Sequence, residues 1–394
     1  MIVITIFVML VLIVFGIHTI YPLVLKRLSR KTDSFASSYN HNLISDTDKL
    51  GEKLPFVSVI IPVHNEELVI ERRINNIFES SFPKNKLELI VVDSGSMDNT
   101  RSIIEEKFPE TVILLKEQKR SGKAHAINLA LGICKGDIVV ITDGPTVYQK
   151  DTILQLVSSL RNPYVGGVSA LYNVPNADEN QVTAAEQKFW SYKDKIRILE
   201  SKVYSTSWLS GEACAFKKEI VKRIDEDTLA DDSNVALQIV SRGYRVVVNE
   251  NSNFIEKSPS EFYDYIKIKS RRVLGGLIET LRFRFFLFNR KYGYFGLIIF
   301  PYRFFTQFIT PIALYIAVIL SIPAAIELST NFGSYLVLLI GVCLLILGLL
   351  FRNKLIAYLY LLITTSLALW MLLTNKRDVR WAQSRATRQK SEQK

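Results

Sequence analysis

Cysteine is scarce in this chain of 394 residues, and its spacing excludes two classes of site. The three cysteines, Cys134, Cys214 and Cys343, lie far apart, and none belongs to a CxxC pair. Isolated thiols in odd number predict neither a disulfide framework nor a cysteine-bound zinc, and they suit a reducing compartment. Glycine and proline number 18 and 12, which excludes a collagen-like chain, and an apolar content of 48% excludes intrinsic disorder.

Two phosphate-binding signatures are also absent. The chain contains no GxxxxGK[ST] segment, which excludes a P-loop. No GxGxxG follows its first predicted strand, which argues against a dinucleotide-binding fold. His64 and His125 have no histidine or cysteine partner at ligand spacing, so we expect no zinc site.

Basic residues outnumber acidic ones by 11, an excess that suits a nucleic acid, an acidic substrate or an anionic membrane surface. Residues 26–31, 267–303 and 376–394 carry net charges of +4, +8 and +5, which leaves −6 for the rest of the chain. The positive segments lie beside apolar runs, whereas the main body is mildly acidic. We therefore expect contact with membrane lipids and no nucleic-acid partner.

Four long apolar runs predict membrane-spanning helices. The first, Ile2 to Leu25, exceeds the length of about 20 residues that crosses a bilayer. Basic residues follow this run instead of preceding it, which argues against a cleaved signal peptide. The other three runs cover about 304–326, 333–350 and 355–373. Three residues interrupt the start of the second run, which we expect to lie in the membrane interface: Pro301, Arg303 and Pro311.

The charges beside these runs predict the topology, with one conflict. By the positive-inside rule, residue 26 onward is cytoplasmic, and we expect a multi-pass protein of the plasma membrane with a cytoplasmic catalytic domain. Three further crossings would place the basic tail 376–394 outside, against the same rule. Arg352 and Lys354 favour a cytoplasmic turn and sharpen the conflict. Either one run does not cross, or the tail breaks the rule.

Changes in composition divide the chain into five predicted parts. They are an N-terminal transmembrane helix with its basic flank (1–31), a polar linker (32–54), a cytoplasmic domain (55–290), a set of interfacial and transmembrane helices (291–375) and a basic tail (376–394). The cytoplasmic domain has an ordinary soluble composition, and we expect the functional site there.

The cytoplasmic domain alternates predicted strands with predicted helices. Short apolar or β-branched runs indicate strands at 57–61, 87–92, 111–115 and 137–142. Helical patterns lie between them, and this alternation predicts a parallel sheet flanked by helices. In such sheets ligands bind beyond the carboxyl ends of the strands.

Polar residues follow each of these four strands. They are Pro62, Asn65 and Glu66 after the first, Asp93 and Ser96 after the second, Lys123 after the third and Asp143 after the fourth. An aspartate at a strand end can accept a hydrogen bond from a base, and another can hold a divalent cation. A Gly-Lys pair at a helix start supplies N–H groups and a cation to phosphate. Four such turns at one edge predict a nucleotide site.

Four segments resemble glycosyltransferase family 2, a family of inverting enzymes with a nucleotide-sugar-binding GT-A fold. They are VSVIIPVHNE, LIVVDSGSMDNT, GKAHAINLAL and ADDSNVALQIVSRGYRV, and the resemblance covers about residues 55–285. It implies a Rossmann-like α/β GT-A domain of the nucleotide-diphospho-sugar transferases, flanked by transmembrane α-helices. It also implies an enzyme that transfers a sugar, with inversion, from a nucleotide-sugar donor such as a UDP-sugar. The expected acceptor is a lipid-linked or cell-surface glycan.

The resemblance assigns a donor-binding role to nine residues. Asp93 would bind the base, expected to be uracil, Glu66 would lie near the ribose and base, and Lys123 would face the pyrophosphate or the base. Asp143 matches the first aspartate of the DxD motif, which contacts the donor and the metal. The expected donor site is completed by Pro62, Asn65, Ser96, Arg271 and Arg272.

The base and the acceptor pocket are expected further along the chain. Asp232 matches the catalytic base, with Asp231 as its acidic neighbour, and adjacent like charges raise the pKa of one carboxylate. From the residues alone, an acidic helix start that suits the macrodipole is the preferred interpretation of the pair, and the resemblance reverses that preference. The segment WLSGEACAF resembles the loop that shapes the acceptor pocket, which points to Trp208, Gly211 and Glu212.

Two departures from the family pattern qualify these expectations. The DxD motif reads Asp143-Gly144-Pro145, so the second carboxylate is missing and dependence on Mg²⁺ or Mn²⁺ is in question. The stretch Lys269 to Val273 lacks the Gln and Trp of the processive Gln-x-x-Arg-Trp motif, which favours single-sugar transfer. The alternative to an enzyme is an inactive, glycosyltransferase-like subunit that serves as a binding or scaffold protein.

Overall fold

The computed structural model describes residues 2–32, 54–333 and 352–374, and one mixed sheet forms the centre of its α/β part. The eight strands of this sheet follow the order β3-β2-β1-β4-β7-β6-β8-β5. The four predicted strands are present as β1 (Val57–Val63), β2 (Leu87–Ser94), β3 (Val112–Glu117) and β4 (Ile138–Thr142). They pair in parallel, so their carboxyl ends meet at one edge.

The other half of the sheet departs from the expected parallel arrangement. β7 (Ala213–Lys217) runs antiparallel to both of its neighbours, β4 and β6 (Val165–Asn173). β8 (Arg245–Ile255) pairs in parallel with β6, and the short β5 (Val147–Tyr148) closes the edge beside β8. Strand–helix alternation predicts direction only where a helix crosses back over the sheet, and β7 is entered from a loop.

Helices cover both faces of the sheet because successive strand residues point to opposite sides. In β1, Ile60 packs in the core built with α6 and α9, whereas Val59 and Ile61 pack in the core built with α4, α5 and α7. These helices are α4 (Ile70–Phe78), α5 (Thr100–Lys107), α6 (Lys123–Ile133), α7 (Thr152–Leu160) and α9 (Asp231–Ser241), and a 3₁₀ turn, η3, spans Lys84–Lys86.

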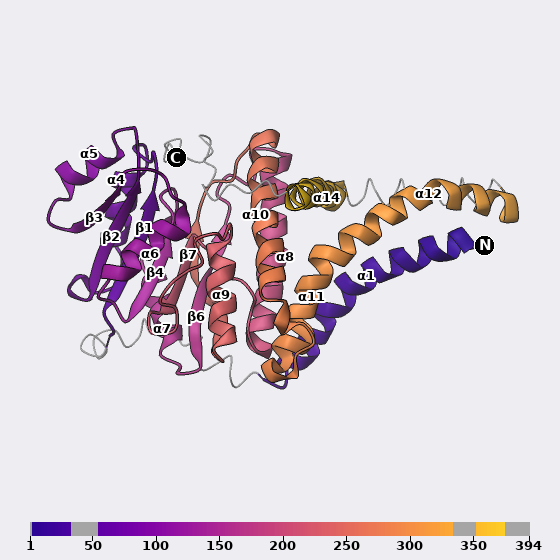
Figure 1. The fold of residues 1–394 in the computed structure, drawn as a ribbon, viewed down its shortest axis with the longest axis horizontal. Helices are drawn as coiled ribbons and strands as arrows, with labels where there is room; N and C mark the ends of the chain where they lie inside the picture. The colour runs from indigo at the N-terminus through magenta and orange to yellow at the C-terminus, as the bar shows by residue number, and fades with distance from the viewer. Residues whose placement is uncertain (1, 33–53, 334–351, 375–394) are drawn as a thin grey trace.

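Two long helices, α8 (Gln181–Val203) and α10 (Phe262–Arg282), stand between the sheet and the apolar helices (Figure 1). A chain of short turns and helices leads on from α10, formed by η4 (Arg284–Phe286), η5 (Arg290–Tyr292), the π-helical η6 (Phe295–Ile299), α11 (Phe300–Phe304) and the π-helical η7 (Phe305–Ile309).

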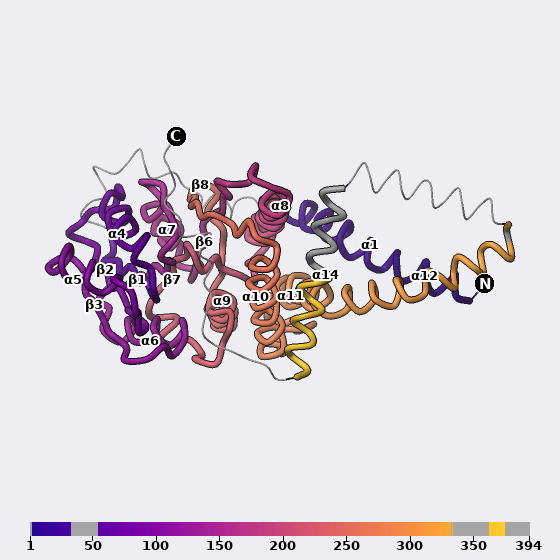
Figure 2. The backbone as a smooth tube through the Cα atoms, turned by 90° about the horizontal axis from the view of Figure 1, so that it is seen from above, coloured from indigo at the N-terminus to yellow at the C-terminus, as the bar shows by residue number. Residues whose placement is uncertain are grey.

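The apolar helices extend away from the α/β part. α1 (Ile2–Ser29) and α12 (Thr310–Phe332) lie side by side in both views, and α14 (Arg352–Leu373) packs on α10 (Figures 1 and 2). Tyr21 of α1 joins them to the α/β part, because its hydroxyl donates to Glu200 of α8 at 2.7 Å. Its ring also stacks on Tyr302 of α11.

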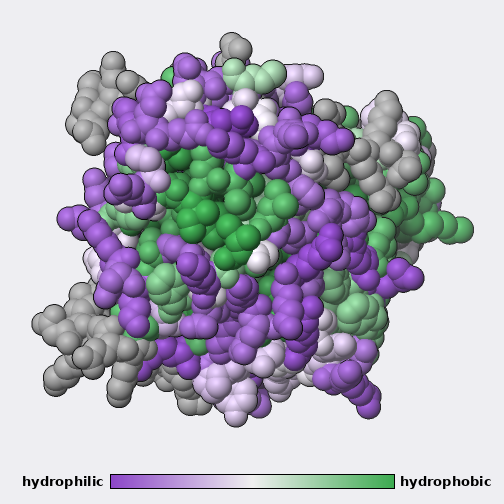
Figure 3. All heavy atoms as spheres, turned by 60° about the vertical axis from the view of Figure 1, so that its left-hand side comes forward, coloured by the Kyte–Doolittle hydropathy of each residue, from purple (hydrophilic) through white to green (hydrophobic). Residues whose placement is uncertain are grey.

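Two helical stretches of the described chain are long and apolar enough to cross a membrane, Ile2–Ser29 and Phe295–Asn331. A shorter apolar helix covers Leu362–Leu373. The predicted run 333–350 and the basic tail 376–394 lie outside the described residues, apart from Gly333. Figure 3 shows a hydrophobic area in the middle of the face brought forward, surrounded by hydrophilic residues. Large hydrophobic residues are also exposed along α1 and α12.

Candidate active site

The turns after β1 and β2 are bonded to each other. The backbone N–H of Asn65 donates to Ser96 Oγ at 2.9 Å, and that of Met97 donates to Asn65 Oδ1 at 2.8 Å. Asn65 has a φ of +52°, a left-handed conformation that asparagine tolerates better than most residues. Pro62 and Glu66 are buried beside this turn. The strand-end edge therefore assembles four of the predicted site residues.

Asp93 is fully buried at the end of β2, and both of its carboxylate oxygens have partners. Arg101 of α5 donates to Oδ2 from Nε at 2.9 Å and from Nη2 at 2.5 Å, and the N–H of Ser96 donates to Oδ1 at 3.1 Å. The sequence did not predict Arg101, although it lies eight residues after Asp93. A contact between Asp93 and a base stays a prediction, and the arginine fixes the carboxylate in place for it.

Lys123, at the start of α6, connects two predicted carboxylates. Its Nζ lies 2.7 Å from Asp143 Oδ1 and 3.5 Å from Asp231 Oδ2. Burial acts to lower the pKa of Lys123, but the carboxylates of Asp143 and Asp231 outweigh it and raise the pKa above its ordinary value. A permanently charged ammonium thus joins the turns after β3 and β4 to the start of α9.

Gly211 lies at the centre of this group. A Cβ added to it would stand 3.3 Å from Lys123 Nζ and 3.6 Å from Asp232 Cβ. A Cβ at this position would therefore press on the ammonium and be in ordinary contact with the predicted base. The absence of a side chain leaves space between Lys123 and the two aspartates.

Asp232 is held at the start of α9 by two donors. The indole Nε1 of Trp208 donates to its Oδ2, and the N–H of Ser233 donates to its Oδ1 at 2.6 Å. Burial, followed by repulsion from Asp231, raises the pKa of Asp232 to about 6. A carboxylate with this pKa is ionised at neutral pH yet accepts a proton more readily than an exposed aspartate, which suits a general base.

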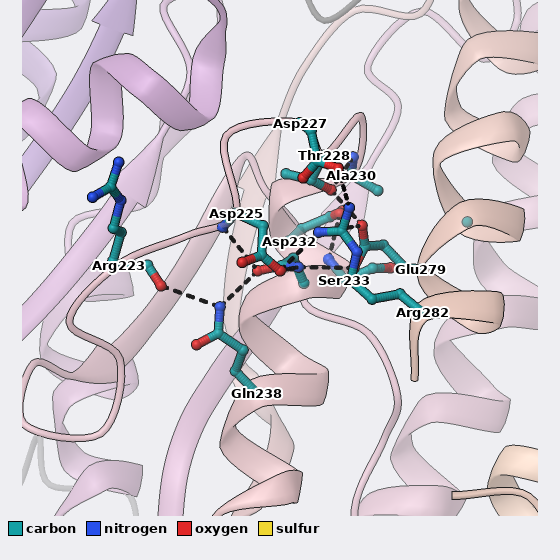
Figure 4. A network of polar contacts seen from close by, with 12 residues as sticks. Arg223, Asp225, Asp227, Thr228, Ala230, Asp232, Ser233, Gln238, Glu279 and Arg282 are labelled. Atoms are coloured by element: carbon teal, nitrogen blue, oxygen red, sulfur yellow. Dashed lines mark hydrogen bonds and ion pairs between the residues drawn. The ribbon is translucent and has the colours of Figure 1, made fainter. Parts of the chain in front are cut away.

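The loop that precedes the two aspartates is fastened to α10, as Figure 4 shows. Glu279 accepts hydrogen bonds from Thr228 and from Asn234, at 2.7 and 2.8 Å. Arg282 forms ion pairs with Asp225 and Asp227, both at 2.7 Å. These residues lie 45 to 57 positions apart in the chain, so no local pattern pointed to them. They fix the position of the loop from which Asp231 and Asp232 emerge.

An open cleft lies beside Lys123. Six of the predicted residues line it: Pro62, Glu66, Lys123, Asp143, Glu212 and Arg272. Arg272 Nη2 forms an ion pair with Glu212 Oε1 at 3.0 Å, across 60 positions of sequence. Arg271 is not among the residues that line the cleft, because adjacent residues of a helix such as α10 point in different directions.

Two carboxylates of the cleft were not predicted from the sequence. Glu256, directly after β8, accepts a hydrogen bond from Thr146 at 2.6 Å. Burial, followed by repulsion from Glu212 and Asp143, raises the pKa of Glu256 to about 8. Glu186 of α8 pairs with Lys269 of α10 at 2.7 Å. The one available signal for Glu256 was an acidic residue directly after a strand, which is the pattern that singled out Asp93 and Asp143.

The residues present do not by themselves form a divalent-cation site. Pro145 lines the cleft where the family pattern has a carboxylate, and Asp143 is paired with Lys123. Nowhere in the described part of the chain do three or more His, Cys, Asp or Glu side chains group at ligand spacing.

The mixed sheet, the polar strand-end turns and the half-buried aspartate pair are typical of one class, the transferases of the GT-A fold. Residues 58–225 match the family described as Glycosyl transferase family 2. The resemblance to this family, the GT-A fold and the transferase class expected from the sequence are thereby supported.

Similar proteins extend the match beyond these residues. The probable glycosyltransferase YdaM of Bacillus subtilis (strain 168) is 27% identical over 270 residues, which is 66% of this chain and 64% of the relative. The beta-monoglucosyldiacylglycerol synthase of Trichormus variabilis is 25% identical over 193 residues, covering 47% and 41%. This chain thus spans less than two thirds of the length of these curated relatives.

A solved structure is similar over almost the whole chain. The mannosyltransferase PcManGT from Pyrobaculum calidifontis, in complex with GDP-Man and Mn²⁺, superposes with a TM-score of 0.75 at 26% identity. The match covers 95% of this chain and all of that one. The similarity therefore includes apolar helices as well as the α/β part.

Proposed function

We propose that this glycosyltransferase moves a single sugar, with inversion, from a UDP-sugar to a lipid-linked or cell-surface glycan acceptor at the membrane. The observation that carries the proposal is the half-buried Asp232, whose raised pKa and two donors suit a base, and whose neighbour Asp231 lies 3.5 Å from the Lys123 that pairs with Asp143. The membrane acceptor is supported by the apolar helices, and the name of one relative, beta-monoglucosyldiacylglycerol synthase, denotes a lipid product.

The donor would lie across the strand-end edge. Its base and ribose would occupy the turn formed by Asn65, Ser96 and Glu66, above the buried Asp93. Its diphosphate would lie against Lys123 and Arg272, whose charges neutralise the leaving group as the bond to the sugar breaks. Arg271, which does not line the cleft, would act on the diphosphate only after a rearrangement, and we assign the contact to Arg272.

The reaction itself needs one proton transfer. Asp232 takes the proton of the acceptor hydroxyl while its oxygen attacks the anomeric carbon from the face opposite the diphosphate. The bond between the anomeric carbon and the phosphate oxygen breaks, and the nucleoside diphosphate leaves with the electron pair. Trp208 and Gly211, beside Asp232, would shape the acceptor pocket, with Glu212 orienting Arg272.

Turnover by the full chain in lipid nanodiscs tests this proposal. The assay supplies radiolabelled UDP- and GDP-sugars with a lipid extract, so that it also identifies the base. We expect Asp232→Asn to bind the donor as the wild type does and to lose turnover by at least about 10²-fold, the lower end for a general base. An inactive wild type that still binds nucleotide sugar would favour the scaffold alternative. An active Asp232→Asn would overturn the base assignment.

We propose that a divalent cation contributes little to this enzyme, in contrast to what the Mn²⁺ of the similar mannosyltransferase structure suggests for that protein. The available metal ligands support this proposal. Pro145 stands where the family pattern has a carboxylate, and the carboxylate of Asp143 is already paired with Lys123. We expect chelation with EDTA to lower turnover less than about 3-fold, and Mn²⁺ to restore it. A loss of 100-fold or more, reversed by Mn²⁺ alone, would contradict this.

The membrane arrangement is part of the proposal. We propose that α1 and the stretch Phe295–Asn331 cross the membrane of a multi-pass protein, with the α/β part in the cytoplasm. Reporter fusions after residues 31 and 290 would then both report the cytoplasm. A fusion after residue 394 decides between the two topologies that the basic tail leaves open, and an external report at residue 290 would overturn the arrangement.

A further inference from the structure

Arg303 and Glu327 are the two charged residues of the apolar stretch Phe295–Asn331, and Arg303 is only 8% exposed. It lies on α11, between the π-helical turns η6 and η7. Burial of an ionised group costs several kcal/mol unless its surroundings compensate it. Within the described residues no carboxylate forms an ion pair with Arg303. Its hydrogen bonds go to neutral groups, and the carboxylates of Glu279, Asp232 and Glu200 compensate its charge from a longer distance.

The guanidinium of Arg303 donates to four neutral acceptors on three separate elements. Nη1 donates to the carbonyl of Ser207 at 2.6 Å, and Nη2 donates to Ser233 Oγ at 3.3 Å. Nε donates to Thr280 Oγ1 at 2.7 Å, and Nη2 also reaches the carbonyl of Gly276 at 3.4 Å. A guanidinium is suited to this task because its donors form a fixed planar fork.

Two of these acceptors adjoin the base and its partner. Ser207 precedes Trp208, and Ser233 follows Asp232, while Trp208 itself donates to Asp232. The contacts therefore close a ring that runs from Arg303 through Ser207 and Trp208 to Asp232, and back through Ser233. The closing residue comes from the apolar stretch, 96 positions after Ser207 and 70 after Ser233.

We propose that Arg303 is a positioning residue. Through it, the apolar stretch holds Trp208 and Asp232 in the relative position that proton transfer requires. The inference rests on the proposed role of Asp232 as the base. Gly276 allows η7 to pack closely on α10, because a Cβ at position 276 would stand 3.2 Å from Gln307 Nε2 of η7. Gln307 in turn accepts from Thr280, a partner of Arg303, so α10 is joined to η7 beside its bond to α11.

Turnover kinetics of Arg303→Lys and Arg303→Gln test the proposal in the full chain. Arg303→Lys keeps the charge and loses the fork, and we expect kcat to fall by roughly 10-fold with the KM for the donor within twofold of wild type. Arg303→Gln loses both, and we expect a fall of roughly 100-fold, the size of a small misplacement of a catalytic group. Arg284→Gln, an exposed neighbour in the same basic segment, is the matched control.

The pH profile separates positioning from a general loss of structure. The charged groups that face Asp232 are Asp231 of its own helix, Glu212 after the Trp208 loop, Lys123 of α6 beyond Asp231, and Arg303 of α11. Removal of the positive charge in Arg303→Gln would move the acid limb of kcat to higher pH, whereas Arg303→Lys would leave it in place. Added guanidinium is expected to restore part of the activity of Arg303→Gln.

Three outcomes would overturn the proposal. The first is a kcat for Arg303→Lys equal to that of wild type. The second is a loss of turnover in the Arg303 variants that is explained by weaker donor binding. The third is a loss of turnover that is explained by lower thermal stability. If Arg303→Gln does not fold, Ser233→Ala carries the test, with an expected severalfold fall in kcat at unchanged donor KM. Failure of the base assignment is distinguishable, because it appears as an active Asp232→Asn irrespective of position 303.

Discussion

The two halves of the candidate site are built in different ways. The strand-end region, formed by the turns after β1 to β4, uses residues that directly follow parallel strands, and its contacts link neighbouring turns, as between Asn65 and Ser96. The helix region, formed by the Trp208 loop, the start of α9, α10 and α11, joins residues far apart in sequence. Arg272 and Glu212 are separated by 60 positions, and Arg303 and Ser207 by 96. Topology places the first region, whereas tertiary packing places the second.

The largest expected effect comes from the residue that joins the two regions. Lys123→Met removes the charge between Asp143 and Asp231 and leaves two half-buried carboxylates without their cation. We expect kcat/KM to fall by about 100-fold or more, as for loss of one transition-state charge partner. Donor affinity, measured by titration calorimetry, is expected to fall with it. Lys119→Met, an exposed lysine of the same turn, is the control and should behave as wild type.

A change confined to donor affinity in Lys123→Met, with kcat unaltered, would show that the lysine serves only the strand-end region. A change confined to kcat would show that Lys123 acts only in the helix region, with the proposed base Asp232. The comparison between the two regions is sharpened by either result, because Lys123 contacts carboxylates of both.

The pH dependence of turnover reports on the helix region. Because the pKa of Asp232 is raised to about 6, the base is ionised above this pH and protonated below it. We expect kcat/KM to be level above about pH 7 and to fall tenfold per unit below pH 6. Trp208→Phe removes a donor that lowers this pKa, so its acid limb should move to higher pH. An acid limb below pH 5 in the wild type would contradict the assignment.

The sequence predicted the strand-end region well because its logic is local. A buried strand followed by a polar turn locates Asp93, Lys123 and Asp143 without knowledge of the rest of the chain. Asp231 and Asp232 needed the family resemblance, because an acidic helix start is common. Arg303 was noted only as an interruption of an apolar run, and Glu256 was not noted at all. Their roles depend on which elements pack together, which periodicity does not encode.

The smallest expected effects come from a pair of glycines. Gly275 lies on α10, in the helix region, and Gly132 lies on α6, the helix that follows the turn after β3. A Cβ at Gly275 of α10 would stand 2.9 Å from Ala230 Cβ and 3.0 Å from the backbone of Leu229, in the loop that leads to the base. Gly275→Ala should therefore lower stability by about 1–3 kcal/mol and turnover severalfold. A Cβ at Gly132 of α6 meets nothing within 4 Å, so Gly132→Ala should raise stability by up to about 1 kcal/mol and leave turnover unchanged. Thermal unfolding and turnover of both variants measure the pair, and equal behaviour of the two would mean that the close approach of α10 to the loop does not set the position of Asp232.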